Sequence, residues 1–443
     1  MPVDAVRDAA VRVLLEVFEK GTFLDVALDK ILRRAQVTPR GRRFLTQLVY
    51  GTVRYRQLCD HALTKLVHQP LEDLPRPIQT ILRMGVFQSL FCNQVTFPAM
   101  VHTSVDLARK YGHAGTARLV NAVLRRAPHS LDDVKLPEPS TDFEKYLSIR
   151  HSMPSWLVRK WLSEHGSEWA EQLCVASNTQ SPVTLRVNLA TTSVEQVSTQ
   201  LARKSCKTTK QTPIPEELTV IEGEFPSRSK LFQEGHFIFQ DPASMLPPHL
   251  LEPQPGEKIL DLCAAPGGKT THLAQLVHGE SPIVALDLRP DKFRLIRDNI
   301  GRLGVPGIMC ICGDGTRPPF APGFDRILVD APCSGLGTLR RHPDLKWRLR
   351  PEDPAELAEL QRALLRTAIR LCKNGGRIVY SVCTFTREET EEVVGHVLEH
   401  EEVDLEDGPE WLNQWRMERG QYQTLPQRDG LDGFFLTRLR KRS

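Results

Sequence analysis

Residues 258–276, KILDLCAAPGGKTTHLAQL, constrain the fold of this chain more than any other segment. Ile259, Leu260 and Leu262 form the short apolar run that is typical of a buried parallel strand. Gly267 and Gly268 follow, where the backbone must turn tightly, and apolar residues then recur at helical spacing. A strand, a glycine turn and the start of a helix form the usual nucleotide pocket of an α/β sheet.

Two common forms of that pocket are excluded by the spacing of the glycines. The segment has no G-x-G-x-x-G, and the residue five before Gly268 is Cys263, where a Walker loop requires glycine. We therefore expect a nucleoside-like ligand without a triphosphate. The residues expected to contact it in this loop are Cys263, Ala264, Ala265, Pro266, Gly267, Gly268 and Lys269.

The C-terminal part of the chain, residues 239–443, alternates strand and helix patterns, which predicts a Rossmann-like α/β domain. Further strands are expected at 283–287, 307–312, 326–330 and 377–380, with helices at 291–303 and 354–371. This alternation favours a parallel sheet that is covered on both faces. Ligands of such sheets bind outside the carboxyl ends of the strands.

Four aspartates, Asp261, Asp287, Asp314 and Asp330, lie at or just after the predicted strand ends. Asp287 lies twenty residues after Gly267, where a carboxylate accepts hydrogen bonds from ribose hydroxyls. Asp314 is placed to reach the exocyclic amine of an adenine. Each acid could instead cap a helix, and that alternative is strongest for Asp314.

Residues 1–130 are predicted to be an all-helical bundle. They carry 19 Lys and Arg against 10 Asp and Glu, a formal charge of +9 within a chain of +4. The excess suggests an anionic partner such as RNA, or equally a solvated helical surface. Residues 44–54 and 82–88 resemble the NusB-type RNA-binding domain, and Arg42, Arg43 and Arg54 are the residues expected to face RNA.

Between these parts, residues 131–152 are predicted to be a linker and residues 153–238 a small α+β module similar to an RNA-recognition sheet. Strands are expected at 184–188 and 218–221, a helix at 193–201 and a loop at 205–213. No membrane span, signal peptide or C-x-x-C pair occurs in the sequence. We therefore expect a cytoplasmic protein with no metal, no membrane partner and a monomeric state.

Two cysteines follow predicted strands within recognisable motifs, DAPCSG at 330–335 and YSVCT at 380–384. Together with DLCAAPGGKT at 261–270 they resemble motifs IV, VI and I of the RNA 5-methylcytosine methyltransferases. The whole chain resembles the bacterial RsmB (Sun/Fmu) branch of that family, which methylates small-subunit (16S) ribosomal RNA. Val382 departs from the threonine that relatives usually carry.

This resemblance implies S-adenosylmethionine as cofactor and 16S ribosomal RNA as partner. It implies that Cys383 is the nucleophile, that Cys333 resolves the covalent adduct, and that Asp330 and Lys269 contact the base and the cofactor. The chemistry demands a soft nucleophile, because a thiolate adding to carbon 6 of cytosine turns carbon 5 into a nucleophile. A buried structural role for the two thiols is the alternative.

The segment after motif IV interleaves basic residues with an aromatic one. Arg340, Arg341, Lys346 and Trp347 are expected to hold phosphates and to stack a base, or to form a packed lid. Two other functions compete with rRNA methylation. One is the same chemistry on tRNA, and the other is a catalytically silent NusB-like RNA-binding protein, against which the cysteine pair argues.

Overall fold

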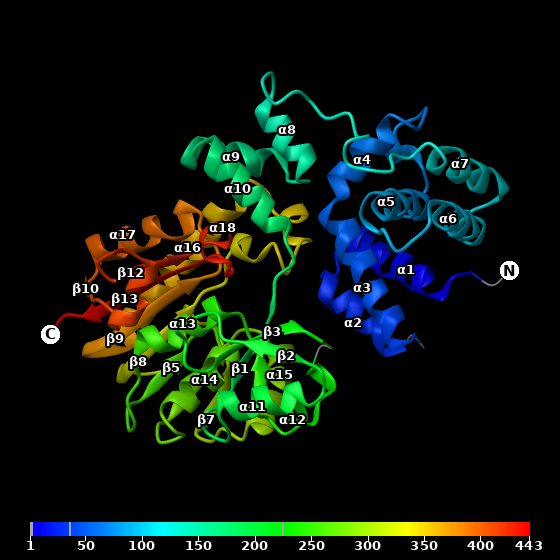
Figure 1. Ribbon diagram of the computed structural model, residues 1–443. Coiled ribbons are helices and arrows are strands. Elements are labelled where there is room, and N and C mark those ends of the chain that lie inside the picture. The colour runs from blue at the N-terminus through cyan, green and yellow to red at the C-terminus, as the bar shows by residue number, and fades with distance from the viewer. Residues whose placement is uncertain (1–2, 35–36, 224–225) are drawn as a thin grey trace. The chain divides into compact units, whose positions relative to one another are not determined.

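The computed structural model describes residues 3–34, 37–223 and 226–443. The chain forms two compact units (Figure 1), unit 1 with Met1–Thr179 and Leu339–Leu349, and unit 2 with Gln180–Thr338 and Arg350–Ser443. The chain therefore leaves unit 2 a few residues after motif IV, enters unit 1 and returns. No described helix is both long and apolar enough to cross a membrane.

Unit 1 is helical, as the apolar periodicity predicted for residues 1–130. Its helices are α1 (Ala5–Lys20), α2 (Leu24–Arg34), α3 (Pro39–Arg54), α4 (Arg56–Thr64), α5 (Arg76–Phe91), α6 (Phe97–Tyr111), α7 (Ala114–Leu124), α8 (Phe143–Arg150), α9 (Ser155–His165) and α10 (Ser167–Asn178). Helix α8 lies inside the predicted linker, which is therefore not a simple connection. Its N-terminus is capped by Asp142, whose side chain accepts from the Lys145 backbone N–H.

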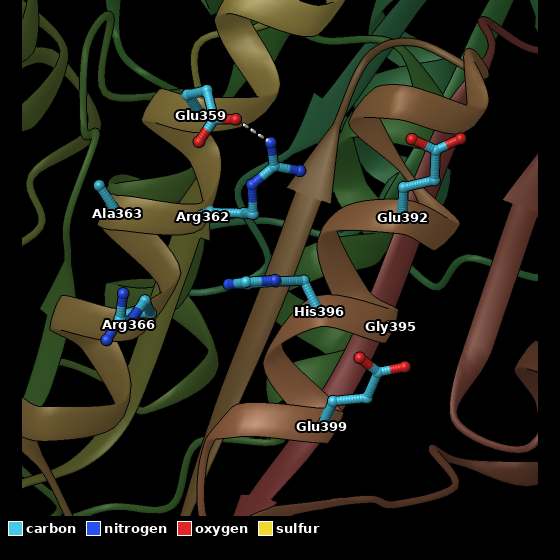
Figure 2. A pocket seen from close by; sticks show the side chains of 8 residues that line it. All are labelled: Glu359, Arg362, Ala363, Arg366, Glu392, Gly395, His396 and Glu399. Atoms are coloured by element: carbon cyan, nitrogen blue, oxygen red, sulfur yellow. Dashed lines mark hydrogen bonds and ion pairs between the residues drawn. The ribbon is translucent and has the colours of Figure 1, made fainter.

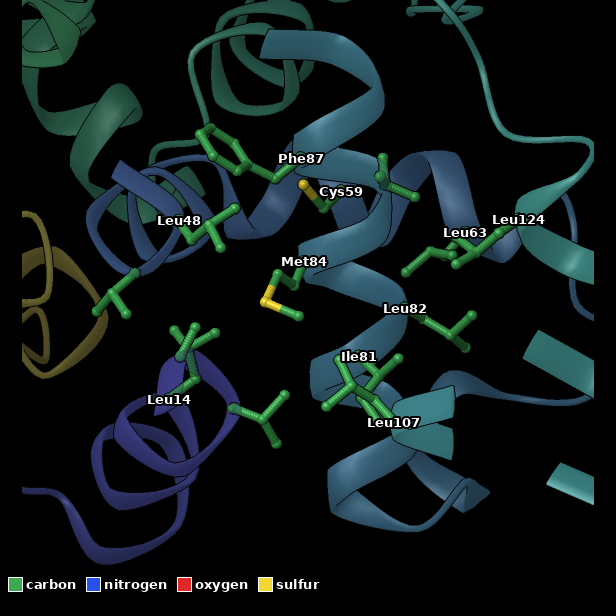
Figure 3. Close-up of a cluster of buried hydrophobic side chains, with 14 of the residues drawn as sticks. Leu14, Leu48, Cys59, Leu63, Ile81, Leu82, Met84, Phe87, Leu107 and Leu124 are labelled. Carbon is green, nitrogen blue, oxygen red and sulfur yellow. The ribbon is translucent and has the colours of Figure 1, made fainter. Parts of the chain in front are cut away.

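The central helix of the bundle is α5, of whose 16 residues 12 are buried. Figure 3 shows Ile81, Leu82 and Met84 of this helix within a cluster of apolar side chains that other helices also supply. Glycine permits the close packing, because a Cβ at Gly51 of α3 would lie 1.9 Å from the Phe87 ring. This is the physical reason for the glycine in the NusB-like motif of residues 44–54.

Residues 339–349 are held in unit 1 by polar contacts as well as packing. The Trp347 Nε1 donates to the Val53 carbonyl oxygen at 2.7 Å, and the Arg348 guanidinium donates to the carbonyls of Gly21 and Thr22. The segment following motif IV is thus part of the helical unit.

Unit 2 contains a four-stranded antiparallel sheet with strand order β2-β3-β1-β4. Its elements are β1 (Val183–Val187), α11 (Val194–Ala202), β2 (Lys207–Thr209), β3 (Glu217–Glu222), α12 (Lys230–Gln233) and β4 (Phe237–Phe239). Strands β1 and β3 and helix α11 confirm the pattern seen in the sequence. The loop predicted at 205–213 is wrong in part, because residues 207–209 pair with β3 as an edge strand.

The larger sheet of unit 2 has the order β11-β12-β13-β9-β8-β5-β6-β7, with β10 paired to β13. Its strands are β5 (Ile259–Asp261), β6 (Ile283–Asp287), β7 (Ile308–Cys312), β8 (Phe324–Asp330), β9 (Cys372–Val382), β10 (Val403–Leu405), β11 (Arg416–Glu418), β12 (Gln421–Thr424) and β13 (Phe434–Lys441). Strands β5 to β9 are parallel, as predicted. The sheet as a whole is mixed, because β13 joins β9 antiparallel and extends the edge.

Helices cover both faces of this sheet (Figure 1). They are α13 (Pro242–Leu251), α14 (Gly268–Leu276), α15 (Phe293–Leu303), α16 (Asp353–Leu371) and α17 (Glu391–His400), and a short α18 (Pro426–Asp429) precedes β13. Alternate residues of β8 face opposite cores: Ile327 and Val329 pack with α16 and α17, and Leu328 packs with α13 and α14. This period of two explains why the central strands are apolar almost throughout.

The strand order reverses at β5. From β5 the chain continues to β6 and β7 on one side, and β8 and β9 lie on the other side. The carboxyl ends of β5 and β8 therefore border a topological switch point, where ligands of doubly wound sheets bind.

Candidate active site

The predicted ligand loop connects β5 to α14 at that switch point. Gly267 has φ +97° at the N-cap of α14, and a Cβ there would lie 3.1 Å from the Ile296 Cα of α15. Only glycine suits both requirements. The Ala265 backbone N–H donates to Asp287 Oδ2 at 2.9 Å, which ties the loop to the end of β6. The sequence thus builds a tight loop beside a carboxylate.

Asp287 and Asp314 occupy different environments. Asp287 is half-buried and accepts from the backbone N–H groups of Ala265 and Arg289. Asp314 is exposed, and its Oδ1 accepts from both the backbone N–H and the hydroxyl of Thr316, which lower its pKa. Asp314 therefore stabilises a local turn as well as standing at the predicted position after β7.

Asp261, the fourth acid of the predicted rim, points into the protein. Its carboxylate is 1% exposed and accepts from the Thr270 hydroxyl at 2.6 Å. Burial raises the pKa of Asp261 to about 7, and the nearby Asp330 charge adds to this while Thr270 and Lys269 oppose it. Asp261 is bonded to the first turn of α14 inside the protein and is not exposed at the edge where the strands end.

Asp330 and Lys269 form the ion pair of the site. Lys269 Nζ lies 2.7 Å from Asp330 Oδ2, and the Ser381 hydroxyl donates to Asp330 Oδ1 at 2.8 Å. The Phe434 ring lies under the same ammonium at 5.1 Å. The structure thus joins the first turn of α14 to the ends of β8 and β9. Ser381 and Phe434 were missed as separate site residues, although Ser381 lies within the YSVCT motif.

Cys333 and Cys383, which follow β8 and β9, lie side by side. Their Sγ atoms are 3.2 Å apart, and both side chains are half-buried. The pKa of Cys333 is raised well above its usual value, first by its hydrogen bond with Cys383 and then by burial. Cys333 therefore keeps its proton at neutral pH in the free protein.

Glu389, a buried residue not identified from the sequence, joins the loop that contains Cys333 to the loop that contains Cys383. The carboxylate of Glu389 is fully buried and accepts from the Ser334 backbone N–H at 2.8 Å and from the Thr386 hydroxyl at 2.8 Å. It also accepts from the Ser334 hydroxyl and from Gln361 Nε2. The only sequence signal was an acid six residues after the motif VI cysteine, at the end of a polar loop.

The remaining cysteines differ in exposure, with Cys312 exposed and Cys310 half-buried in β7. Cys263 is half-buried in the ligand loop, and burial raises its pKa well above the usual value, with the charges of Asp261, Asp330 and Asp287 adding to the effect. Cys59, Cys92, Cys174, Cys206 and Cys372 are buried. Among the described residues, a cluster able to hold a metal is formed by Glu216, His249 and His272, and it includes none of the predicted site residues.

A separate hollow of about 810 Å³ lies between α16 and α17 on unit 2. Figure 2 shows Arg362 paired with Glu359, and His396 pointing toward α16. The lining has no cysteine and no residue of the predicted site. We assign it no part in the chemistry.

The basic residues predicted to face RNA divide by exposure. Arg43 is exposed and Arg42 and Arg341 are half-buried. Arg54 donates to the Arg340 carbonyl oxygen, and Arg340 is 5% exposed. Lys346 is 1% exposed, with its ammonium 3.5 Å from Asn178 Oδ1.

Burial therefore argues against phosphate contacts by Arg340 and Lys346. Trp347, whose indole N–H is bonded to Val53, fits the packed alternative considered for this segment. The sequence could not separate the two, because a basic segment with one aromatic residue looks the same in both.

Three family models match consecutive parts of the chain. The NusB family matches residues 4–128, the ferredoxin-like domain of RsmF/B-type methyltransferases matches 153–223, and 16S rRNA methyltransferase RsmB/F matches 248–440. These assignments agree with the three kinds of domain expected from the sequence. The middle match includes α9 and α10, which in the structure belong to unit 1.

Relatives extend over the whole chain. It is 33% identical to the probable ribosomal RNA small subunit methyltransferase B of Bacillus subtilis (strain 168), covering 100% of both chains. It is 35% identical to the probable enzyme of the same name from Synechocystis sp., covering 98% of this chain and 99% of the relative.

Among solved structures, the crystal structure of PH0851 matches with a TM-score of 0.82 and 26% identity over 100% of both chains. A methyltransferase homologue from Pyrococcus horikoshii matches with a TM-score of 0.59 and 28% identity, covering 69% of this chain and 100% of that one. With its loop, its strand-end carboxylates and its paired thiols, the chain belongs to the RsmB/F family of 16S rRNA methyltransferases.

Proposed function

We propose that this protein methylates carbon 5 of a cytidine in 16S ribosomal RNA, with S-adenosylmethionine as methyl donor and a covalent adduct on Cys383. The observation that carries the proposal is the 3.2 Å separation of the Cys333 and Cys383 sulfur atoms beside the Asp330–Lys269 pair. Methylation of an exocyclic amine or a hydroxyl does not require two thiols at one site.

The residues at the switch point fit the cofactor by their donors and acceptors. We expect the Asp287 carboxylate to accept from ribose hydroxyls and the Asp314 carboxylate to accept from the adenine amine. Residues 263–268 supply small side chains and backbone N–H groups near the N-terminus of α14. S-adenosylmethionine, when bound, supplies a methyl group on a sulfonium, which is open to attack by a carbon nucleophile.

The cysteines divide the covalent steps between them. The Cys383 thiolate adds to carbon 6 of cytosine, and the electron pair of the 5,6 double bond moves toward carbon 5. Carbon 5 would then take the methyl group of bound S-adenosylmethionine, with the electron pair of the broken methyl–sulfur bond leaving on S-adenosylhomocysteine. We expect Asp330, which is paired with Lys269 at 2.7 Å, to hold the N3 edge of the base, and Lys269 to contact both the base and the cofactor. Loss of the proton on carbon 5 then restores the double bond and expels Cys383.

Cys333 is suited to remove that proton because of its neighbour. The hydrogen bond with Cys383 is the first cause of its raised pKa. Once Cys383 is a thioether that cause is removed, and the pKa of Cys333 falls. The thiol is thus a stronger acid after the adduct has formed than before it, while burial and the Glu389 charge continue to raise its pKa.

The target is tested by methyl transfer to defined RNAs. Purified protein is incubated with S-adenosylmethionine and either 16S rRNA or tRNA, and the product is read by bisulfite sequencing. We expect one protected cytidine in 16S rRNA and none in tRNA. Protection in tRNA alone would contradict the rRNA target, and labelled methyl groups without any protected cytidine would contradict the carbon 5 chemistry.

A further inference from the structure

Arg186 links the small sheet of unit 2 to the helix that carries the cofactor loop. It lies in β1 and is 0% exposed. Its Nη1 donates to the Gly268 carbonyl oxygen at 2.5 Å and to the side-chain oxygen of Gln240. Its Nη2 donates to the Thr271 hydroxyl at 2.9 Å. One guanidinium therefore binds the first turn of α14 at two positions.

The direction of Arg186 follows from the alternation of β1. Leu185 and Val187 pack into the apolar core of the small sheet with α11 and β3. Arg186 must then project from the opposite face of that sheet. This face meets α14, so the sheet presents a charged side chain where an apolar one would suffice for packing.

Burying the guanidinium is costly. Burial lowers the pKa of Arg186 to about 9, so the group is still charged at neutral pH. A buried charge destabilises a protein unless it is hydrogen-bonded, and an apolar residue of similar volume is often as stable. A cation at the first turn of a helix also opposes the helix dipole. General stability is therefore a poor explanation for an arginine here.

The same module holds α14 at a further point. Glu216, which precedes β3, places its Oε1 2.7 Å from Nε2 of His272 in α14 and 2.9 Å from Nε2 of His249 in α13. Burial lowers the pKa of His272 to about 3, so this imidazole is neutral at pH 7. Thr271 and His272, consecutive residues of the helix, are thus both contacted by the small sheet.

Glu216, His249 and His272 could instead be ligands of a metal ion. Two ligands of one tetrahedral zinc, each at about 2.0–2.1 Å, stand about 3.3 Å apart. Glu216 Oε1 is hydrogen-bonded to His249 Nε2 at 2.9 Å, and its 2.7 Å separation from His272 Nε2 is a close polar contact without hydrogen-bond geometry. Both separations are shorter than two ligands of one zinc would have. The charge of Arg186 acts on both Glu216 and His272, which disfavours a further dication. The cluster is better explained as a polar contact between the sheet and α13 and α14.

We infer that Arg186 is a positioning residue for the cofactor site: it fixes the first turn of α14 and thereby the loop of residues 263–268. Lys269, which pairs with Asp330, lies between the two positions that Arg186 binds, so the arginine also sets where that ammonium stands. The small sheet then fixes the position of the methyl-donor pocket, in addition to any contact that it makes with RNA. This inference rests on the proposed function in that S-adenosylmethionine must bind at this loop.

The test compares the affinity for S-adenosylmethionine in variants that each remove a contact between the small sheet and the larger domain. Arg186→Met removes the donors, Arg186→Lys retains the charge, and Asn188→Ala is the control. Asn188 also joins the small sheet to the larger domain, but through the Leu303 carbonyl at the end of α15. Labelled S-adenosylmethionine binding by equilibrium dialysis, KM, kcat and the thermal midpoint are measured for the full-length proteins.

We expect Arg186→Met to weaken binding and raise the KM for S-adenosylmethionine at least tenfold, with a smaller fold-change in kcat at saturation that reflects the displaced Lys269 ammonium. Arg186→Lys should be intermediate, and Asn188→Ala should bind within twofold of wild type. If Arg186→Met does not fold, the pair Thr271→Val and Thr271→Ser decides: loss of the hydroxyl should weaken binding severalfold, and serine should hold it within twofold.

Unchanged affinity in Arg186→Met would overturn the inference, and so would an equal loss in Asn188→Ala. For the second pair, equal binding by the valine and serine variants would do the same. A wild-type protein that fails to bind S-adenosylmethionine would instead contradict the proposed function, so the two failures are distinguishable.

Discussion

Cys333 and Cys383 are 50 residues apart in the chain, yet their sulfur atoms stand 3.2 Å from each other. The parallel pairing of β8 with β9 produces this closeness, because it sets Asp330 opposite Ser381 at the strand ends. The two loops leave the sheet together, and each places its cysteine within three residues of that pair. Both sulfur atoms therefore lie at the same edge of the sheet.

The buried Asp261 gives folding stability a pH dependence that can be measured. Its pKa is about 7 in the folded protein and about 3.9 in the unfolded chain. Between these values the folded state binds more protons, so this group makes the free energy of unfolding fall as pH rises, by up to about 1.4 kcal/mol per pH unit. In urea unfolding, the free energy of unfolding of Asp261→Asn should therefore rise relative to that of wild type by about 2 kcal/mol as the pH is raised from 5 to 8. An identical pH slope in the two proteins would refute the assignment.

Replacing Glu389 should lower both the free energy of unfolding and the rate of methyl transfer. Glu389→Ala leaves the Ser334 N–H and the Thr386 hydroxyl without their acceptor in a buried site. The Ser334 hydroxyl and the Gln361 amide lose one of two acceptors, because Thr384 and the Pro332 carbonyl remain. We expect a loss of about 2–4 kcal/mol in the free energy of unfolding, since each unpaired buried donor costs about 1–3 kcal/mol. Methyl transfer should fall further than stability explains, because both cysteine loops lose their brace. Glu388→Ala, at the neighbouring position, is the control, and equal effects of the two changes would remove Glu389 from this role.

Gly51 tests the packing of the helical bundle. Gly51→Ala forces a methyl group against the Phe87 ring, and overpacking of this kind costs about 1–3 kcal/mol. Gly395→Ala in α17 meets no atom within 4 Å and should gain about 0.5–1 kcal/mol from helix propensity. Denaturant unfolding of both variants decides the matter. A neutral Gly51→Ala would show that the two helices pack less closely than the structure has them.

Lys346 should behave as a buried amine and not as an RNA contact. Burial lowers its pKa well below the usual value, so the unfolded chain binds more protons and stability rises with pH through this group. Lys346→Met should therefore be as stable as wild type or more stable at pH 7, with the gain shrinking toward pH 10. Calorimetric unfolding at several pH values measures this. A variant that is less stable than wild type at pH 7 and recovers toward pH 10 would contradict the prediction.

The same residue provides a contrast for RNA binding. We expect Arg43→Met, an exposed change on α3, to lower the salt slope of log K for 16S rRNA by about 0.7–0.9. Lys346→Met should leave that slope unchanged. Filter binding at several salt concentrations gives both slopes, and the reverse order would show that residues 339–349 face the RNA after all.

The sequence was sufficient for much of the site because short-range patterns carry it. The strand and glycine turn around Gly267 predict the loop, and strand-end positions predict Asp287, Asp330 and the two cysteines. These residues come together because parallel strands end at one edge, which is a property of the fold class.

What the sequence could not show depends on contacts between distant segments. Whether Lys346 and Trp347 are exposed is decided by helices more than 160 residues away in the chain. Glu389 and Arg186 have no local signature, because a buried charge in a strand or a loop resembles a surface one. The antiparallel extension by β13 was missed for a similar reason: its partner is fixed by the tertiary sheet and not by its own pattern.

The central claim is the covalent route through Cys383 with release by Cys333, and the most direct measurement is capture of the adduct. Wild type, Cys333→Ala, Cys383→Ala and the double variant are incubated with 16S rRNA and labelled S-adenosylmethionine, then separated on a denaturing gel. We expect a methyl-labelled protein–RNA band for Cys333→Ala alone and no methylation by either protein that lacks Cys383. Full activity of Cys383→Ala, or an adduct of undiminished yield in the double variant, would contradict it.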